Sequence, residues 1–316
     1  MPTTWICAEP ASCHDRDLTQ ARRLTYLARQ SGADAIKWQL YTAESLRRKR
    51  NAGDYYYAYL ATELPPAWIP DLKRTAEEIG LEFLCSVYDE WGMETVGPYL
   101  QTYKIASFEA RDLSLLSRLR LTCEQSKQNV ILSTGMCSLE EVRESVDVLG
   151  PEHIRYLLHC ASAYPCPPED INVRAMLQLA GIPGIGLEKV GLSDHTLSIT
   201  APVVAVSLGG RAIEKHLTSD RKRVGPDHKF ALEPKEFYQM GVMIREAERA
   251  LGDGEKRMRE SEKEMSKYRV AGPRAAGPRA AGPTEGEHPT HPADIAAIAA
   301  KVGKADGMQM GKIRFI

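Results

Sequence analysis

Short runs of apolar, branched and aromatic residues recur along most of the chain, and stretches with helical periodicity separate them. Eight such runs begin near Trp5, Ala35, Phe83, Tyr103, Val130, Tyr156, Val190 and Ala212. Their mean spacing of about 30 residues is the size of one strand–helix unit. The pattern therefore predicts an α/β protein, a (β/α)8 TIM barrel over residues 1–268.

The stretches between the runs carry helix signals. Residues 17–31 place apolar side chains on one face, with Asp17 before the first turn and Gly32 after the last. Similar starts and stops predict helices over residues 66–79, 138–149 and 234–251.

The longest gap, between the second and third runs, holds the basic residues 47–50 and the tyrosines 55–57. We interpret this gap as an extended loop over one mouth of the barrel. The basic residues are then a solvated charge run, and the tyrosines are part of a lid or a dimer surface.

After Gly252 the periodicity ends. An Ala-Gly-Pro-Arg-Ala sequence repeats at 271–275 and 276–280, so residues 269–283 are interpreted as a low-complexity linker. Residues 284–316 form a short tail in which residues 292–302 could make one helix.

The composition adds a few exclusions. The 41 basic and 42 acidic residues leave a formal charge of −1, which argues against binding to nucleic acid or to an anionic membrane surface. Because the chain shows neither an apolar run of about 18 residues nor a signal peptide, we expect no membrane span and a cytoplasmic location. The seven cysteines are an odd number without a Cys-x-x-Cys pair and are expected to be reduced, mostly buried thiols.

Polar residues follow the predicted strands at their carboxyl ends, where TIM-barrel enzymes build their active sites. They are Glu9, Lys37, Gln39, Ser86, Lys104, Ser107, Ser133, Thr134, His159, Ser162, Tyr164, Ser193, Asp194, His195, Glu214, Lys215 and His216. This set predicts a polar site inside one end of the barrel.

His195 and His216 end what should be neighbouring strands, about 4.8 Å apart. Two imidazoles at that spacing could share one divalent ion and leave positions open for water and substrate. The alternative is structural, with His195 near the start of the next helix and His216 hydrogen-bonded at the rim of the barrel.

Lys37 and Lys104 lie within apolar strands, where an unpaired ammonium group is costly to bury. With Ser107, Ser133 and the backbone near Gly135 they could form a site for a phosphate or carboxylate group. Alternatively, each lysine forms a buried salt bridge with Glu9 or Glu214.

Two carboxylates are candidates for the chemistry. Glu9 is the best placed for proton transfer or for binding a substrate hydroxyl, with an ion pair at the rim as the alternative. Asp227 could reach a polyol or a metal-bound water, but taken alone it is more simply explained as part of an ordinary turn.

The chain resembles the sialic acid synthase (N-acetylneuraminate synthase) family over approximately residues 4–270. The matching segments are 8–9 with His14, 32–39, 104–107, 131–136, 159–160 with 164–165, 191–196, 214–218 and 225–228. The resemblance implies a TIM barrel that uses a divalent ion, with Mn, Mg or Co expected. It also implies condensation of phosphoenolpyruvate with an N-acetylmannosamine-type aldehyde sugar, which gives a 2-keto sugar acid and phosphate.

Carried over position by position, the resemblance implies a role for each matching residue. It assigns the metal ion to His195 and His216, and the sugar to Gln39 and Asp227. It implies catalytic roles for Glu9, Asp227 and Tyr164. Phosphoenolpyruvate is assigned to Lys37, Lys104, Ser107, Ser133, Ser86 and Ser162, with Tyr164 close by.

The sequence departs from the family pattern mainly where the acceptor sugar should bind. Phe108 stands in place of a usual glycine, and Cys13, Arg16, Ser86, Val87 and Ser162 also differ from the common residues. The family's C-terminal antifreeze-like domain, which contacts the sugar's N-acetyl group, does not follow the barrel. The acceptor then differs, the tail substitutes, or a separate protein supplies the cover, and the expectation of a homodimer is weakened.

Two other functions stay open at the level of sequence. One is a non-catalytic barrel of the same family that acts as a binding or scaffold subunit and need not bind an ion. The other is a metal-dependent aldolase or hydrolase, which would release no phosphate from phosphoenolpyruvate. Metal binding and phosphate release separate these functions from a synthase.

Overall fold

A computed structural model describes residues 3–50 and 55–270 of the chain. Eight parallel strands close into a barrel in chain order, and β1 pairs with β8. The strands are β1 (Trp5–Glu9), β2 (Ala35–Leu40), β3 (Glu82–Val87), β4 (Thr102–Ile105), β5 (Asn129–Ser133), β6 (Ile154–Cys160), β7 (Val190–Asp194) and β8 (Ala212–His216). Each predicted run begins within two residues of the first residue of a strand, so the predicted (β/α)8 barrel is confirmed.

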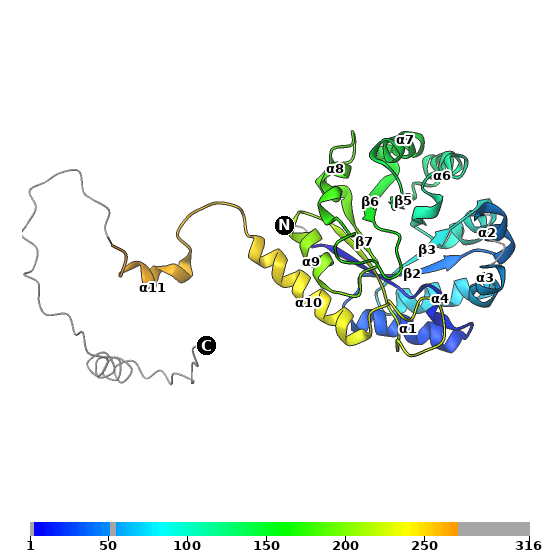
Figure 1. The fold of residues 1–316 in the computed structure, drawn as a ribbon, viewed down its shortest axis with the longest axis horizontal. Coiled ribbons are helices and arrows are strands. Elements are labelled where there is room, and N and C mark those ends of the chain that lie inside the picture. Colours follow the sequence, from blue (N-terminus) through cyan, green and yellow to red (C-terminus); the bar gives the residue numbers. More distant parts are fainter. Residues whose placement is uncertain (1–2, 51–54, 271–316) are drawn as a thin grey trace, which may run out of the picture. The chain divides into compact units, whose positions relative to one another are not determined.

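Within the barrel unit, residues 1–255, helices lie outside the strands (Figure 1). The α-helices are α1 (Leu18–Gln30), α2 (Ala43–Arg50), α3 (Tyr56–Thr62), α4 (Ile69–Glu78), α5 (Glu90–Val96), α6 (Leu113–Ser126), α7 (Leu139–Leu149), α8 (Met176–Ala180), α9 (Thr200–Ser207), α10 (Pro234–Leu251) and α11 (Lys263–Ser266). The short 3-10 helices are η1 (Ala11–His14), η3 (Pro66–Trp68), η4 (Gly97–Tyr99), η5 (Ser107–Glu109), η6 (Pro151–His153), η7 (Val173–Ala175), η8 (Leu187–Lys189) and η9 (Glu260–Glu262).

The predicted helix ends are confirmed by their capping contacts. Asp17 caps α1 by accepting a hydrogen bond from the backbone N–H of Thr19 at 2.8 Å. At α7, Ser138 and Glu141 form a reciprocal capping box. Helix α10 begins at Pro234 and ends before Gly252, as its sequence predicts.

The prediction of an extended loop between the second and third strands is wrong. The first half of this segment contains helices α2 and α3, on either side of residues 51–54, which lie outside the described part of the chain. The sequence of α2 consists largely of good helix formers, and its last turn is basic, which suits the negative end of the helix dipole.

The interior of the barrel has an apolar half and a polar half. Side chains near the amino ends of the strands form an apolar cluster of Trp5, Cys7, Ala35, Leu84, Ile131, Leu158 and Ala212. Further along the same strands, the buried side chains are ionisable or hydroxylic, including Glu9, Lys37, Ser86, Lys104, Ser133, Ser193, Glu214 and His216. A larger hydrophobic core packs the helices against the outer face of the strands. The strands thus hold polar groups rigidly at one end of the barrel.

The barrel unit ends at Glu255, and the residues from Lys256 on belong to a second unit. Of the predicted linker and tail, residues 269–283 and 284–316, only 269 and 270 lie within the described residues. The 268 boundary and the tail helix therefore stay predictions. None of the described helices has the length and apolar character needed to span a membrane. All seven cysteines are free and six are buried, so the expected burial is confirmed and the reduced state stays a prediction.

Gly191 tests how tightly the barrel wall is packed. A Cβ at this position of β7 would clash with the backbone carbonyl of Ala212 on β8. We expect Gly191→Ala to lower the free energy of unfolding by about 1–3 kcal/mol, because the two strands must separate. Urea unfolding at pH 7 measures this change.

The control is Gly241→Ala on α10, where the nearest atom is the Ser31 carbonyl oxygen at an ordinary 3.7 Å. It should leave stability unchanged or raise it by up to about 1 kcal/mol, through alanine's better helix propensity. Equal stability of Gly191→Ala and the wild type would show that the strands do not need a glycine here.

Candidate active site

A cavity of about 330 Å³ opens at the carboxyl ends of the strands, where the sequence predicts the site. It brings together ten of the predicted site residues: Glu9, Lys37, Gln39, Lys104, Ser107, Ser133, Tyr164, His195, His216 and Asp227. Ser86 and Ser162 do not line it: Ser86 contacts Lys37, and Ser162 lies 3.8 Å from the thiol of Cys160. The remaining lining residues are Arg50, Tyr88, Ala106, Phe108, Ser193, Glu214, Pro226 and Phe230.

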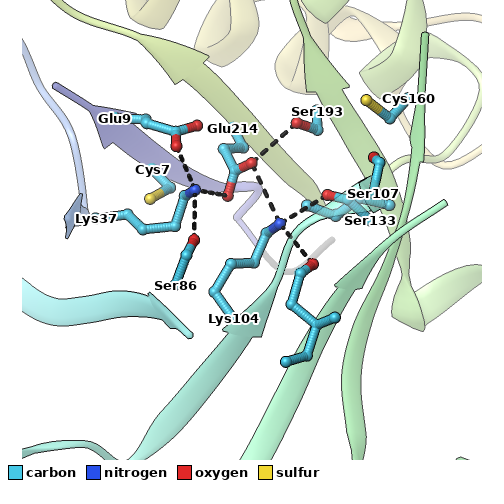
Figure 2. A network of polar contacts seen from close by, with 12 residues as sticks. Cys7, Glu9, Lys37, Ser86, Lys104, Ser107, Ser133, Cys160, Ser193 and Glu214 are labelled. Carbon is cyan, nitrogen blue, oxygen red and sulfur yellow. Dashed lines mark hydrogen bonds and ion pairs between the residues drawn. The ribbon is translucent and has the colours of Figure 1, made fainter. Parts of the chain in front are cut away.

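Lys37 on β2 is held by two carboxylates, Glu9 from β1 and Glu214 from β8 (Figure 2). Its Nζ lies 2.5 Å from Glu9 Oε1 and 3.6 Å from Glu214 Oε2, and it donates to Ser86 Oγ at 3.1 Å. Burial lowers the pKa of Lys37, but the attraction of Glu214 and Glu9 outweighs burial and raises it above its ordinary value. Lys37 therefore stays charged without any ligand.

Glu9 is ionised for the complementary reason. Burial would raise its pKa, and the attraction of Lys37 and then of His216 holds the pKa below its ordinary range. Gln39 Nε2 also donates to Glu9 Oε1 at 2.7 Å, so one carboxylate oxygen has two fixed donors. The register of β1 against β8, which pairs Glu9 with His216, directs this carboxylate toward the histidine.

Lys104 is held less firmly than Lys37. It donates to Ser133 Oγ at 2.8 Å and to the carbonyl of Ile105 at 3.0 Å, while Glu214 Oε1 lies 3.6 Å away (Figure 2). Burial lowers its pKa, and the attraction of Glu214 only partly offsets this. An anion bound beside Lys104 would favour the charged form, so this side chain suits an anion site.

Glu214 lies between the two lysines and also accepts a hydrogen bond from Ser193 at 2.9 Å. The structure therefore shows the feature on which each of the two explanations for the buried lysines depends. Each lysine is close to a carboxylate, and each also borders the cavity.

His195 and His216 lie side by side, with ring centroids 5.4 Å apart. His195 Nδ1 lies 3.0 Å from the carbonyl of Ala161, which leaves Nε2 as the atom that can bind a ligand. Burial lowers the pKa of His216 and favours its neutral form, and its Nδ1 is buried without a hydrogen-bond partner in the described structure. An unpartnered nitrogen on a neutral ring fits a metal ligand.

The two histidines do not complete a metal site by themselves. Within residues 3–50 and 55–270, no group of three or more His, Cys, Asp or Glu side chains is arranged to hold an ion. Water and substrate oxygens would have to supply the remaining ligands, as an open catalytic site requires.

Tyr164 and Asp227 border the outer part of the cavity. The centroid of the Tyr164 ring lies 4.3 Å from the His195 centroid and 5.3 Å from the Phe230 centroid. Asp227 Oδ2 accepts a hydrogen bond from the backbone N–H of Ser12 at 2.9 Å. Asp227 is thus more than an ordinary turn residue, because its turn places it on the cavity wall.

A profile of the NeuB family matches residues 24–256 of the chain. The chain belongs to the NeuB family. This membership confirms the resemblance to sialic acid synthases that the sequence motifs indicate.

NeuB-family relatives cover most of the chain. An N,N'-diacetyllegionaminic acid synthase of Legionella pneumophila is 36% identical over 82% of this chain and 76% of its own length. A pseudaminic acid synthase of Campylobacter jejuni is 34% identical over 79% of this chain and 75% of its own length. The solved N-acetylneuraminic acid synthetase of Leptospira borgpetersenii has a TM-score of 0.76 and 29% identity, over 84% of this chain and 91% of that one.

The interpretation of residues 47–50 as a solvated charge run is wrong for Lys49 and Arg50. Lys49 pairs with Asp112. Arg50 lines the cavity: its Nη2 lies 2.7 Å from Glu109 Oε1, and its guanidinium lies 4.3 Å above the Phe108 ring. Because the segment is a helix, its basic side chains point in different directions, and only Arg47 and Arg48 face solvent.

Lys37 provides a test of the buried ion pairs in this NeuB-family site. We expect Lys37→Met to lower the free energy of unfolding at pH 7 by about 3–5 kcal/mol, because Glu9 and Glu214 lose their shared counter-charge. In the wild type Glu9 has a lowered pKa, so its contribution is present above the ordinary glutamate pKa and is lost only in stronger acid. In the variant the pKa of Glu9 rises, and protonation near pH 4 relieves the penalty.

The stability gap between wild type and Lys37→Met should therefore narrow as the pH falls from 7 to 4, measured by urea unfolding. Lys73→Met is the control, since Lys73 pairs with the largely exposed Glu77 on the surface of α4. It should cost at most about 1 kcal/mol at either pH. A gap for Lys37→Met that is the same at both pH values would contradict the assignment of charges.

Proposed function

We propose that this NeuB-family protein is a metal-dependent transferase that condenses phosphoenolpyruvate with an aldehyde sugar of the N-acetylmannosamine type. The products are a sialic-acid-like 2-keto sugar acid and phosphate. The observation that carries the proposal is the cavity itself, in which buried Lys37 and Lys104 lie beside the histidine pair. The names of the relatives, synthases of three different acids of this kind, support it.

In this proposal the phosphoenolpyruvate anion binds along β4 and β5. Lys104 and Ser133 already contact each other at 2.8 Å, and the backbone N–H of Gly135 donates to Ser107 Oγ at 3.0 Å. These groups are preformed donors with little freedom to lose on binding, which favours recognition of phosphate or carboxylate oxygens. Lys37 is a second, permanently charged neighbour of the anion.

His195 and His216 would hold a divalent ion, with Mn, Mg or Co proposed. When bound, the ion would supply Lewis-acid polarisation of the aldehyde oxygen. The histidines fit because the unpartnered Nδ1 of His216 and the free Nε2 of His195 belong to adjacent rings.

The reaction joins the methylene carbon of phosphoenolpyruvate to the aldehyde carbon, and the aldehyde oxygen takes up a proton. Water then adds to the cationic carbon that carries the phosphate and loses one proton. The C–O bond to phosphate breaks, phosphate leaves, and the new hydroxyl loses its proton to give the ketone. We assign the carboxylate of Glu9, the acid side chain closest to the histidine pair at 3.4 Å from His216 Nε2, to proton transfer. Gln39 and Asp227 are assigned to the sugar, and Asp227 and Tyr164 to its protonation and orientation.

The alternatives have weaker support. A scaffold barrel would have no need for buried ionisable side chains, since burying Lys37, Lys104, Glu9 and Glu214 carries a desolvation cost. An aldolase or hydrolase would not need two lysines beside an anion-binding backbone. We propose a cytoplasmic location and a homodimer as further features of the protein.

The decisive test is phosphate release from phosphoenolpyruvate. Metal-stripped protein should be inactive, and Mn, Mg or Co should restore release with one of a panel of N-acetylated, diacetamido and plain aldoses. We expect His216→Ala to lower release by at least about a hundredfold, because it removes half of the protein's metal ligands.

His153→Ala is the matched control, because His153 lies before β6 at the opposite end of the barrel. It should release phosphate at the wild-type rate. Release that is indifferent to metal, or to His216→Ala, would exclude this mechanism.

The Arg50–Phe108 contact leads to a prediction about which acceptor sugar the protein prefers. Phe108 is half-exposed at the cavity, and the Arg50 guanidinium covers its ring. We expect Phe108→Ala to raise kcat/KM for a bulkier diacetamido aldose, relative to N-acetylmannosamine, by about tenfold.

Arg50→Lys should act in the same direction but more weakly, because an ammonium group stacks less well on the ring. Arg47→Lys, an exposed residue of the same helix, should not change the ratio. A ratio that stays constant in Phe108→Ala would remove the ring from acceptor selection.

A further inference from the structure

His228 follows Asp227 in the loop between β8 and α10, and it is fully buried. Both ring nitrogens have partners. Nδ1 lies 2.6 Å from the hydroxyl of Thr218, and Nε2 lies 2.8 Å from Oδ1 of Asp15. Thr218 follows the end of β8 and Asp15 follows η1, so the ring bridges two segments that leave the barrel at different strands.

Neighbouring contacts hold both partners of the ring in place. The other oxygen of Asp15 accepts from Arg223 Nε at 2.6 Å. The hydroxyl of Thr218 accepts from the backbone N–H of Asp220 at 3.2 Å. A Cβ on Gly225 would lie 2.8 Å from Cδ2 of His228, so the loop lies tightly against the ring.

Asp227 is fixed by the same arrangement. Its carboxylate accepts from the N–H of Ser12 in η1, the segment that also leads to Asp15. The bond at Ser12 thus sets where the carboxylate points, and the bridge through His228 sets how closely the loop approaches η1. A carboxylate on an untethered loop would have to be ordered each time a substrate binds, at a cost in affinity.

We propose that His228 is a positioning residue for the acceptor sugar: by joining Thr218 to Asp15, it holds the Asp227 carboxylate on the cavity wall. The imidazole does not touch the cavity, and it acts through Asp227. This inference rests on the proposed function, because it assumes that Asp227 binds the acceptor.

Three substitutions divide the bridge into its parts. Asn places a polar atom near the position of Nδ1 and keeps the contact to Thr218, whereas Gln places one near Nε2 and keeps the contact to Asp15. Leu removes both contacts at similar volume. Arg221→Ala is the control, because Arg221 contacts the Ala231 carbonyl within the same loop and Glu236 on α10 without involving His228.

The experiment measures KM for the best wild-type acceptor, KM for phosphoenolpyruvate, Mn²⁺ affinity and melting temperature. We expect His228→Leu to raise the acceptor KM by about tenfold, the effect of losing one well-placed hydrogen bond. The phosphoenolpyruvate KM and the Mn²⁺ affinity should change by less than about twofold, within the scatter of neutral substitutions. His228→Asn and His228→Gln should fall between Leu and wild type, and Arg221→Ala should match wild type.

A double-mutant cycle separates positioning from a general structural role. In an Asp227→Asn background, His228→Leu should raise the acceptor KM no further. The proposal would be overturned if His228→Leu raised the acceptor KM by the same factor in the Asp227→Asn background as in the wild type. An equal rise in KM for both substrates would overturn it as well.

A wild-type protein that releases no phosphate would refute the proposed function instead. In that case, crystal structures of the wild type and His228→Leu decide the inference. Loss of the bond from Ser12 to the Asp227 carboxylate in the variant supports it, and an unmoved carboxylate overturns it.

Discussion

The balance of charge inside the barrel is the constraint on which the rest of this structure depends. Lys37 and Lys104 are buried near Glu9 and Glu214 at the inner wall of the cavity, where little solvent reaches any of the four side chains. Neither pair of charges could be buried without the other, because an isolated charge there would be neutralised or would unfold the barrel. The raised pKa of Lys37 and the lowered pKa of Glu9 keep this pair oppositely charged before any ligand arrives.

In the proposed function, that balance gives the histidine pair its role. Phosphoenolpyruvate carries several negative charges, and lysines already offset by carboxylates cannot neutralise them alone. A divalent ion at His195 and His216 would supply the missing positive charge close to Glu9. The apolar cluster below, around Cys7 and Leu84, isolates the charges from the other end of the barrel and keeps their mutual attraction strong.

The parts of the structure that follow from local sequence are those that could be predicted. Apolar runs locate the eight strands, and caps such as Asp17 and Ser138 locate the helix starts, because both signals lie within a few neighbouring residues. The strand ends then place Glu9 and His216 at one mouth, since parallel strands in a closed barrel share their direction.

Contacts between distant segments could not be predicted from such local signals in the sequence. Arg50 belongs to a basic run, and only its partner Glu109, from the β4–α6 segment, brings it to the cavity. The outer part of the cavity, including Phe108, Asp227 and Phe230, is built from segments between strands and helices. The inner part is built from strands. The inner part could therefore be predicted from the strand ends, whereas the outer part depends on contacts between distant segments.

The central claim is that the buried charges are balanced until phosphoenolpyruvate and a metal ion bind together. Calorimetric titration of phosphoenolpyruvate into metal-stripped protein, with and without Mn²⁺, tests it most directly. The account predicts that Mn²⁺ tightens phosphoenolpyruvate binding by at least about tenfold, and that phosphoenolpyruvate tightens Mn²⁺ binding by the same factor, as linkage requires. Phosphoenolpyruvate binding that is equally tight without metal would show that the lysines alone carry the anion, and would contradict the account.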